Sequence, residues 1–285
     1  MLRIALPNKG RLSDDARELF ADAGLEVRTG SSRSLTASLG GEFEAIFVRA
    51  QDIPELVADG AADAGVTGWD LVAESGRELV QSLDLEFGKC RIVVAARDDM
   101  AIRSSSEIPD GTRVATVFPN ITRAWFGERA QKVEIVPISG AVEIAPHLGL
   151  ADIIVDLTST GSTLKMNGLR EIETVLESTA RLITSPAADA AKSEILTELI
   201  TALDSVLRAR GKRYLMANVP RDRLDDVKIV LPGLNGPTVI DILNGGSMVA
   251  AHAVVPAAAV YRTIAALRKL GAEGILVTRI ERLMP

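Results

Sequence analysis

The residues in this sequence that are best suited to chemistry lie together in one short segment, IIVDLTSTGSTL, at 153–164. An apolar run from Ile153 to Val155 is typical of a buried strand, and it delivers the carboxylate of Asp156 to a loop of hydroxyl groups. Hydroxyls and free backbone N–H groups at such a turn form a cradle for a phosphate, assisted by the positive end of a helix. Asp156 is placed to bond sugar hydroxyls or to help hold a magnesium ion that is already bound to pyrophosphate. The segment therefore predicts a ligand with a phosphate and a ribose.

The same composition also fits a plain Ser/Thr-rich turn whose hydroxyls only satisfy their own backbone. Neither G-x-x-x-x-G-K-[ST] nor a G-x-G-x-x-G after a strand occurs in the chain, which disfavours ordinary kinases and dinucleotide-dependent dehydrogenases. Two histidines and the single Cys90 cannot furnish a zinc cluster of the usual kind. Any metal is therefore expected to be bound by oxygen.

The elements that must position this segment follow an α/β pattern. Near the start of the chain, the apolar run from Leu2 to Leu6 predicts a buried strand, and a helical pattern with Ser13 as its candidate N-cap follows the break at residues 7–10. Further strands are predicted at 45–48, 64–66, 91–96, 113–117 and 133–137, and helices around 53–57 and over 192–210.

A weak internal repeat indicates how these elements are grouped. Gly60 to Val66 and Gly149 to Val155 share the pattern G-x-A-D-x-x-V, each after a helical stretch and before a Thr/Gly turn. Two lobes of similar construction would explain it, although a string this short can also match by chance. A pair of α/β lobes leaves a cleft that loops at the carboxyl ends of the strands would line.

The pattern changes beyond Gly211. Strands are predicted at 214–219, 238–243, 249–255 and 274–280, and helices at 221–227 and 260–270. This β-α-β-β-α-β order fits a ferredoxin-like module. The module has no obvious nucleophile, acid–base pair or phosphate loop, which favours a regulatory or structural role.

Composition and charge limit the possible partners. The 285 residues carry a net charge of −6 with an isoelectric point near 5.2, which argues against general affinity for nucleic acid or anionic membranes. The apolar stretches are far shorter than a membrane span requires, and the start of the chain lacks the long apolar segment of a secretory signal. We therefore expect a cytoplasmic protein that binds no nucleic acid and no membrane.

The chain resembles the ATP phosphoribosyltransferase family, which catalyses the first step of histidine biosynthesis, in its long form. The stretch from Glu143 to Leu164 fits the family signature E-x5-G-x-A-x2-I-x-D-L-x2-T-G-x-T-L at every fixed position. The segments LRIALPNKGRLSDDARELF, GVTGWDLV, FGKCRIVVA and PGLNGPTV also look like family segments in the same order. The resemblance spans essentially the whole chain.

The resemblance implies an α/β fold with a two-lobed catalytic region like that of periplasmic binding proteins, followed by a C-terminal ferredoxin-like α+β domain. Catalytic lobe I would comprise residues 1–90 and 182–210, lobe II residues 91–181 and the regulatory domain residues 211–285. The implied reaction transfers the phosphoribosyl group of phosphoribosyl pyrophosphate to N1 of ATP and releases pyrophosphate with Mg²⁺. Feedback inhibition by histidine and homo-oligomerisation into dimers and hexamers are implied as well.

Carried onto this sequence, the resemblance assigns catalytic roles to Lys9, Glu143 and Asp156, with Asp156 also the candidate metal ligand. Lys9 and Arg11 would hold phosphates, Asp70 would position the nucleotide, and Glu143 and Asp156 would face the ribose and the metal. The hydroxyl-rich loop would wrap the 5′-phosphate, with these candidate substrate-binding residues: Thr158, Ser159, Thr160, Gly161, Ser162 and Thr163. Arg49 and Arg91, at or beside strand ends, are further candidates for the charged substrates, and a solvated surface charge is the plain alternative for each cation.

In the last domain, a histidine ligand needs acceptors for its amino group and donors for its carboxylate, and Asn218, Thr238 and Thr278 are the candidates. A domain kept only for assembly is the alternative. Because fold alone does not fix function, a solute-binding sensor and an inactive partner subunit also stand as rivals to the enzyme.

Overall fold

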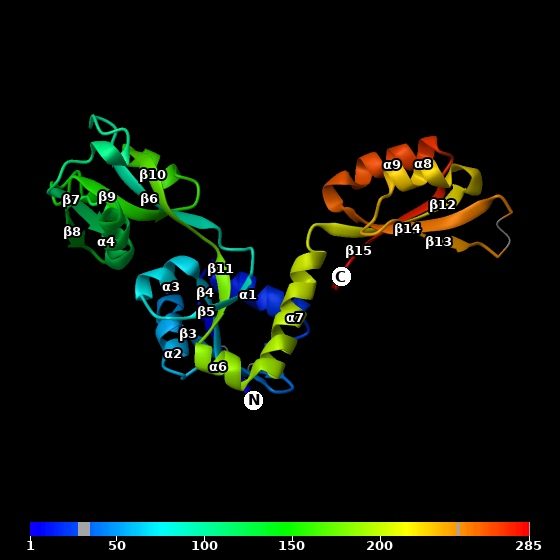
Figure 1. Cartoon of the computed structure of the whole chain (residues 1–285), viewed down its shortest axis with the longest axis horizontal. Helices are drawn as coiled ribbons and strands as arrows, with labels where there is room; N and C mark the ends of the chain where they lie inside the picture. The colour runs from blue at the N-terminus through cyan, green and yellow to red at the C-terminus, as the bar shows by residue number, and fades with distance from the viewer. Residues whose placement is uncertain (28–34, 244–245, 285) are drawn as a thin grey trace. The chain divides into compact units, whose positions relative to one another are not determined.

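The computed structural model describes residues 1–27, 35–243 and 246–284. It divides into two compact units, Met1–Ile200 and Thr201–Pro285. Within the described residues, the first unit contains two β-sheets with helices and the second unit contains one (Figure 1).

The first sheet is built around a parallel pair of buried strands. Its strand order is β2-β3-β1-β4-β11-β5, in which β1 is parallel to β3 and β4, and β11 is antiparallel to β4 and β5. The near-continuous burial of β1 and β4 is typical of parallel strands that are covered on both faces. The strands of this sheet are β1 Leu2–Pro7, β2 Thr36–Gly40, β3 Phe43–Val48, β4 Ala64–Gly68, β5 Val80–Asp84 and β11 Ala180–Thr184. The associated helices are α1 Arg11–Asp22, the 3₁₀ turn η1 Ala50–Asp52, α2 Ile53–Ala58 and α3 Trp69–Ser75.

The second sheet has the order β10-β6-β9-β7-β8, in which β7 is parallel to β8 and β9, and β6 is antiparallel to β9 and β10. Alternate residues of β6 and β9 enter separate apolar clusters on the two faces of the sheet. Its strands are β6 Cys90–Arg97, β7 Thr112–Thr116, β8 Val133–Pro137, β9 Ile153–Thr158 and β10 Leu169–Ser178. Helical segments here are η2 Ser105–Glu107, α4 Pro119–Glu128, η3 Val142–Ile144 and α5 Ser162–Met166, and α6 Pro186–Ala191 and α7 Ser193–Ala209 follow β11.

The chain passes between these two sheets twice, from β5 to β6 and back from β10 to β11. The return brings residues 180–184 into the first sheet, between β4 and β5. The predicted two-lobed α/β architecture is confirmed.

The internal repeat has a structural counterpart at the start of the buried strands. In the first sheet, the backbone N–H of Arg3 donates to Asp63 Oδ2 at 2.8 Å, and the N–H of Asp63 donates back to the carbonyl of Arg3 at 2.8 Å. In the second sheet, Arg113 and Asp152 make the same reciprocal pair, at 2.9 Å in both directions. Each aspartate thus joins the entrance of one strand to that of its parallel neighbour, so the similarity between the lobes is real rather than a chance match.

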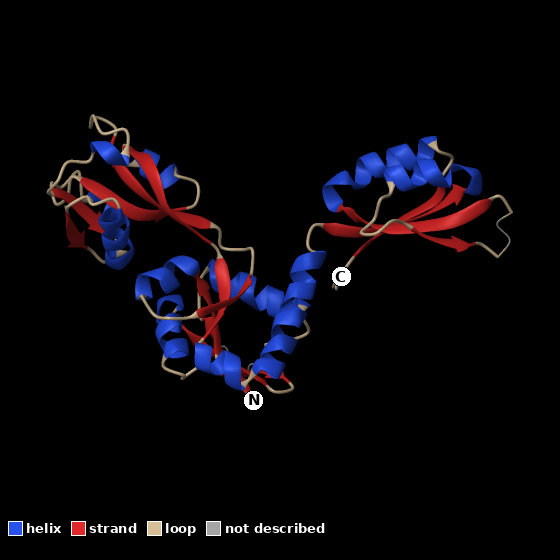
Figure 2. Cartoon of the chain, viewed as in Figure 1, coloured by secondary structure: helices blue, strands red, loops and turns tan. Residues whose placement is uncertain are grey.

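The second unit forms an antiparallel sheet of order β13-β14-β12-β15 with α8 and α9 on one face (Figure 2). Alternate residues of β12 and β14 pack against those helices and form the core, and the other face of the sheet lacks helices in the described residues. The elements are β12 Lys212–Pro220, η4 Arg221–Arg223, α8 Leu224–Val230, β13 Thr238–Asp241, β14 Met248–Pro256, η5 Ala257–Ala259, α9 Val260–Lys269 and β15 Glu273–Arg279. The predicted β-α-β-β-α-β order and ferredoxin-like fold are confirmed.

One local prediction is wrong. Helix α1 begins at Arg11, after Gly10 with a φ of 78°, so Ser13 lies inside the helix and is buried rather than acting as its N-cap. The helix starts earlier because Gly10 adopts a left-handed φ at low cost and its carbonyl accepts from the N–H of Ser13. In the described ranges, no helix has the length and apolar character needed to cross a membrane.

Candidate active site

Asp156 stands near the end of β9, beside a second carboxylate. Its Oδ1 accepts a hydrogen bond from the backbone N–H of Leu157 at 2.8 Å, and Glu143 of η3 lies close enough to interact with it electrostatically. The pKa of Asp156 is raised to about 6, chiefly by burial and also by the negative charge of Glu143, while the Leu157 N–H acts in the opposite direction. Two neighbouring carboxylates that interact electrostatically attract a cation or a hydroxyl donor.

The loop after Asp156 is shaped by its own hydroxyls at some positions and leaves others free. Thr158 is buried, and its Oγ1 accepts the N–H of Gly161 at 2.9 Å, which closes the turn. The hydroxyls of Thr160 and Ser162 lie 2.9 Å apart at the surface. The hydroxyls of Ser159 and Thr163 have no hydrogen-bond partner within the part of the chain that the structure describes. The alternative of a plain turn, whose hydroxyls bond only to their own backbone, therefore explains Thr158 but not the whole loop.

Gly161 gives the loop its conformation. Its φ of 76° lies in the left-handed region, where side chains other than hydrogen are strained, and it immediately precedes α5. A Cβ built at this position would meet no heavy atom within 4 Å. Glycine is therefore required here by backbone conformation rather than by lack of space.

Arg91 lies beside the loop, because β6 pairs with β9 so that Arg91 is opposite Thr158. Its Nε and Nη2 donate to the two carboxylate oxygens of Glu171 at 3.0 and 2.6 Å, and its Nη1 lies 3.5 Å from the carbonyl oxygen of Ser159. The pair with Glu171 keeps the pKa of Arg91 above its usual value.

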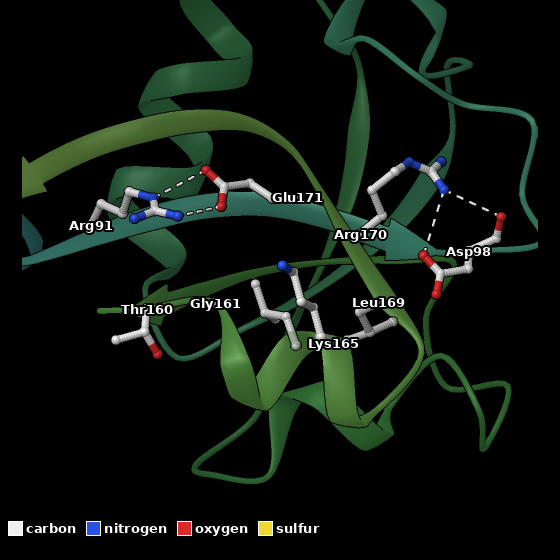
Figure 3. A pocket seen from close by; sticks show the side chains of 9 residues that line it. Arg91, Asp98, Thr160, Gly161, Lys165, Leu169, Arg170 and Glu171 are labelled. Carbon is white, nitrogen blue, oxygen red and sulfur yellow. Dashed lines mark hydrogen bonds and ion pairs between the residues drawn. The ribbon is translucent and has the colours of Figure 1, made fainter.

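A pocket of about 350 Å³ opens next to this pair (Figure 3). Its lining combines loop backbone with cations and acids from β6, α5 and β10: Arg91, Thr160, Gly161, Lys165, Arg170 and Glu171. Figure 3 shows Arg91 turned toward Glu171 and Arg170 turned toward Asp98, while Lys165 extends from α5. With Asp98 also in the lining, the cations outnumber the acids by one.

A second pocket, of about 500 Å³, lies where the chain crosses between the two sheets of the first unit. Ser159 and Arg91 line it together with residues of the crossing segments, among them Lys89 and Arg181. Arg181 forms an ion pair with Asp84, and its buried Nε has no hydrogen-bond partner in the described structure. The loop therefore adjoins two polar pockets.

Lys9, Arg11 and Arg49 lie at one edge of the first sheet. Lys9 and Arg11 follow β1 and Arg49 follows β3, its parallel neighbour, and the N–H of Asn8 donates to the carbonyl of Val48 at 2.8 Å. All three cations are exposed. No hydrogen bond or ion pair within the described residues joins them to the loop of the second sheet.

Asp70 also follows a strand of the first sheet, but its carboxylate is engaged. Asp70 is 6% exposed, the hydroxyl of Ser178 donates to its Oδ1 at 2.6 Å, and the backbone N–H of Asp70 donates to that hydroxyl at 3.0 Å. This contact ties α3 to the end of β10, so Asp70 holds a position in the crossing region rather than facing solvent.

The three residues considered for regulation lie on the face of the second unit's sheet that α8 and α9 do not cover. Asn218 and Thr278 come from neighbouring strands, but Thr278 pairs with Tyr214, four residues or about 13 Å along β12 from Asn218. Thr238 pairs with His252 on the opposite side of β12. The three residues therefore share a face without forming one cluster.

Sequence reasoning missed Glu171, Ser178 and the charged residues of the second pocket other than Arg91. Their roles come from pairings across long separations: Glu171 is 80 residues from Arg91, and Ser178 is 108 residues from Asp70. The strand that carries both, β10, was not among the predicted elements. Recognising β10 as a partner of β6 is the signal that would have found them.

Comparison with known proteins gives a consistent result over the whole chain. Residues 49–205 match the family described as ATP phosphoribosyltransferase, and residues 209–282 match the family described as HisG, C-terminal domain. An ATP phosphoribosyltransferase of Gemmatimonas aurantiaca is 68% identical over 292 residues, with all of both chains covered. The Natronomonas pharaonis protein of the same name is 51% identical over 286 residues, again with full coverage of both.

Among solved structures, an ATP phosphoribosyl transferase (HisG:HisZ) complex from Thermotoga maritima matches with a TM-score of 0.64 and 31% identity. The match covers 73% of this chain and 99% of that chain.

Proposed function

This chain belongs to the ATP phosphoribosyltransferase family, whose members are pentosyltransferases of histidine biosynthesis, and from that premise we propose that it transfers the phosphoribosyl group of phosphoribosyl pyrophosphate to N1 of ATP. The products are phosphoribosyl-ATP and pyrophosphate. The observation that carries the proposal is the loop at 158–163, whose free hydroxyls and left-handed glycine follow directly on the paired carboxylates of Asp156 and Glu143.

On the sugar side, the loop binds the 5′-phosphate of phosphoribosyl pyrophosphate. The hydroxyls of Ser159 and Thr163 are free to donate, and those of Thr160 and Ser162 are exposed. Thr158 and Gly161 keep the backbone in the shape that presents these groups. Asp156 and Glu143 accept hydrogen bonds from the ribose hydroxyls, which fixes the orientation of C1.

The residues present fit a magnesium ion that arrives with the substrate. No group of three or more His, Cys, Asp or Glu side chains placed to hold a metal occurs in residues 1–27, 35–243 and 246–284. The ion in magnesium–pyrophosphate sites is commonly bound by one or two carboxylates and by phosphate oxygens, and Asp156 with Glu143 supplies such a pair. When bound, Mg²⁺ neutralises charge that builds up on the departing pyrophosphate.

On the nucleotide side, the exposed cations at the carboxyl edge of the first sheet bind the phosphates of ATP. Lys9, Arg11 and Arg49 gather there, and cations are the groups that such a charged substrate requires on a chain with a net charge of −6. Adenine N1 needs no activation by a serine or cysteine nucleophile, so the reaction depends on alignment with C1 and on stabilising the leaving group. Asp70 contributes by holding α3 at the crossing region.

We assign these steps to catalytic lobes formed by residues 1–90 with 182–210 and by residues 91–181, and we assign regulation to residues 211–285. Histidine binds to this last domain as a feedback inhibitor, and Asn218, Thr238 and Thr278 are alternative rather than joint candidate contacts, because they share the uncovered sheet face without forming one cluster. Copies of this cytoplasmic enzyme assemble into dimers and hexamers. The match of residues 209–282 to the C-terminal domain of HisG supports the regulatory assignment.

Pyrophosphate release in the presence of Mg²⁺ tests the proposal. The purified chain is given ATP alone, phosphoribosyl pyrophosphate alone, and both together; only the pair should react, and added histidine should slow the reaction. Asp156→Ala should abolish release with the fold retained, whereas Glu134→Ala, which removes an exposed carboxylate of the same sheet, should not. Binding of either substrate without turnover of the pair would instead indicate a sensor or an inactive partner subunit.

A further inference from the structure

No hydrogen bond or ion pair joins Glu171 to the hydroxyl-rich loop in the described structure, yet Glu171 binds Arg91, which lies beside that loop. Its two carboxylate oxygens accept from Nε and Nη2 of Arg91 at 3.0 and 2.6 Å, which is a two-point pairing along one edge of the guanidinium. Such a pairing fixes the plane of the guanidinium as well as its distance. Both side chains are 32% exposed, so the pair is only partly open to solvent.

The pairing leaves three of the five N–H groups of Arg91 unused by Glu171, and one of these three, on Nη1, donates to the loop. Nη1 is not used by Glu171, and it lies 3.5 Å from the carbonyl oxygen of Ser159, the residue at the entrance of the loop. Figure 3 shows the paired edge of Arg91 directed toward Glu171, above the helix that follows Gly161. Arg91 and Glu171 line one pocket with Thr160 and Gly161, and Arg91 and Ser159 also line the second pocket.

We propose that Glu171 is a positioning residue for phosphoribosyl pyrophosphate: it holds Arg91 by one edge so that the free N–H groups of the guanidinium meet a phosphate bound at residues 159–163. The inference rests on the proposed function, because it requires that loop to bind a phosphate. Glu171 acts through Arg91, and it keeps the long arginine side chain from searching other orientations before the substrate arrives.

A second arginine–glutamate pair on the same strand provides a matched control. Glu173 accepts from Nη2 of Arg129 at 3.2 Å, with side-chain exposures of 38% and 34%. The guanidinium of Arg129 stacks on Trp125 at 3.7 Å, and neither Arg129 nor Glu173 lines the pocket next to the loop. An irregularity in the strand register between Glu171 and Glu173 separates the surroundings of the two glutamates.

The test compares Glu171→Gln, Glu173→Gln, Arg91→Ala and the double variant Arg91→Ala with Glu171→Gln in steady-state assays. Glu171→Gln should raise the KM for phosphoribosyl pyrophosphate about tenfold and leave the KM for ATP unchanged, since the neutral amide loses the charge-assisted pair. Glu173→Gln should leave both constants unchanged. The double variant should match Arg91→Ala, because Glu171 has nothing to hold once the guanidinium is gone.

Calorimetric titration of each variant with phosphoribosyl pyrophosphate and Mg²⁺ supplies a readout independent of turnover, and Glu171→Asp, which keeps the charge, should recover part of the affinity. If Arg91→Ala does not fold, Arg91→Lys replaces it in the comparison of single and double variants, because an ammonium cannot form the two-point pair with Glu171.

The inference would be overturned if Glu171→Gln weakened the binding of phosphoribosyl pyrophosphate as much in the Arg91→Ala background as in the wild type. It would also be overturned if Glu173→Gln weakened that binding as much as Glu171→Gln does. Wild-type turnover with an unaffected Glu171→Gln variant would overturn the inference and leave the proposed function standing. Absence of turnover in the wild type would instead remove the proposed function.

Discussion

Replacing Asp156 by Asn should make the protein more stable at neutral pH while it destroys the site. Burial and the charge of Glu143 raise the pKa of the Asp156 carboxyl to about 6, compared with an ordinary 3.8. Asn removes the charge but keeps the carbonyl oxygen that accepts from the Leu157 N–H. The substitution therefore relieves an unfavourable charge without leaving a cavity or an unpaired donor.

The magnitude follows from the pKa. One pH unit corresponds to about 1.4 kcal/mol, so the difference between about 6 and 3.8 corresponds to on the order of 3 kcal/mol. Because Asp156 is partly open to solvent, screening reduces this to about 1–2 kcal/mol of added stability.

The stability of the folded protein changes with pH in the opposite direction to that expected for a salt-bridged aspartate. A carboxyl whose pKa is higher in the folded state than in the unfolded chain lowers stability as pH rises from about 4 to about 6, and the loss persists above that range. The advantage of the Asn variant should therefore be full at pH 7.5 and shrink toward zero at about pH 4.

Urea unfolding followed by tryptophan fluorescence and circular dichroism at both pH values measures this difference. Glu134→Gln on β8, an exposed carboxylate of the same sheet, is the control and should change stability little. Pyrophosphate release should fall about a hundredfold or more in Asp156→Asn. An Asn variant that is less stable than the wild type at pH 7.5, or whose advantage does not depend on pH, would refute the reasoning.

Further predictions concern the loop, the repeat and the metal. Gly161→Ala should cost about 1 kcal/mol of stability and raise the KM for phosphoribosyl pyrophosphate, because Gly161 has a φ of 76°, a left-handed conformation that strains alanine. An unchanged free energy of unfolding in urea would show instead that the loop relaxes without cost. Asp152→Asn should lose about 1 kcal/mol at pH 7, since hydrogen bonds from Arg113 lower the pKa of Asp152. That deficit should shrink in urea unfolding as pH falls below the ordinary aspartate value of 3.8, and a deficit that stays constant there would contradict the assignment. EDTA should stop pyrophosphate release and Mg²⁺ restore it. The rate should fall as pH drops through about 6, as Asp156 takes up a proton that competes with the metal, and a flat profile from pH 5 to 8 would argue against that competition.

Strands in which apolar residues predominate could be predicted from the sequence because burial on both faces leaves a simple signature. Residues 2–6 and 91–96 lie in β1 and β6, and the β-α-β-β-α-β order beyond Gly211 is confirmed. In contrast, β10 mixes charged and apolar residues, and its two register irregularities break the alternation that marks a strand. It was therefore missed.

The candidate site could be predicted only where its residues are neighbours in the sequence. The loop from Asp156 to Thr163 forms a unit because strand, turn and helix follow one another. The burial of Asp70 against Ser178 and the hold of Glu171 on Arg91 depend on how β10 passes beside β6 and α3. Contacts of this kind form only in the folded chain between residues that are distant in sequence, so no local sequence pattern predicts them.

The aspartates at the entrances of β4 and β9 have an effect at the opposite ends of those strands. A parallel strand that slips by one residue turns each of its side chains to the other face, so the bond between Asp152 and Arg113 decides, four residues upstream, which way Asp156 points. A transfer of the hydroxyl-rich loop into another scaffold should therefore include Asp152 and Arg113. A graft that begins at residue 156 would contain the binding residues but not the bond that aligns them.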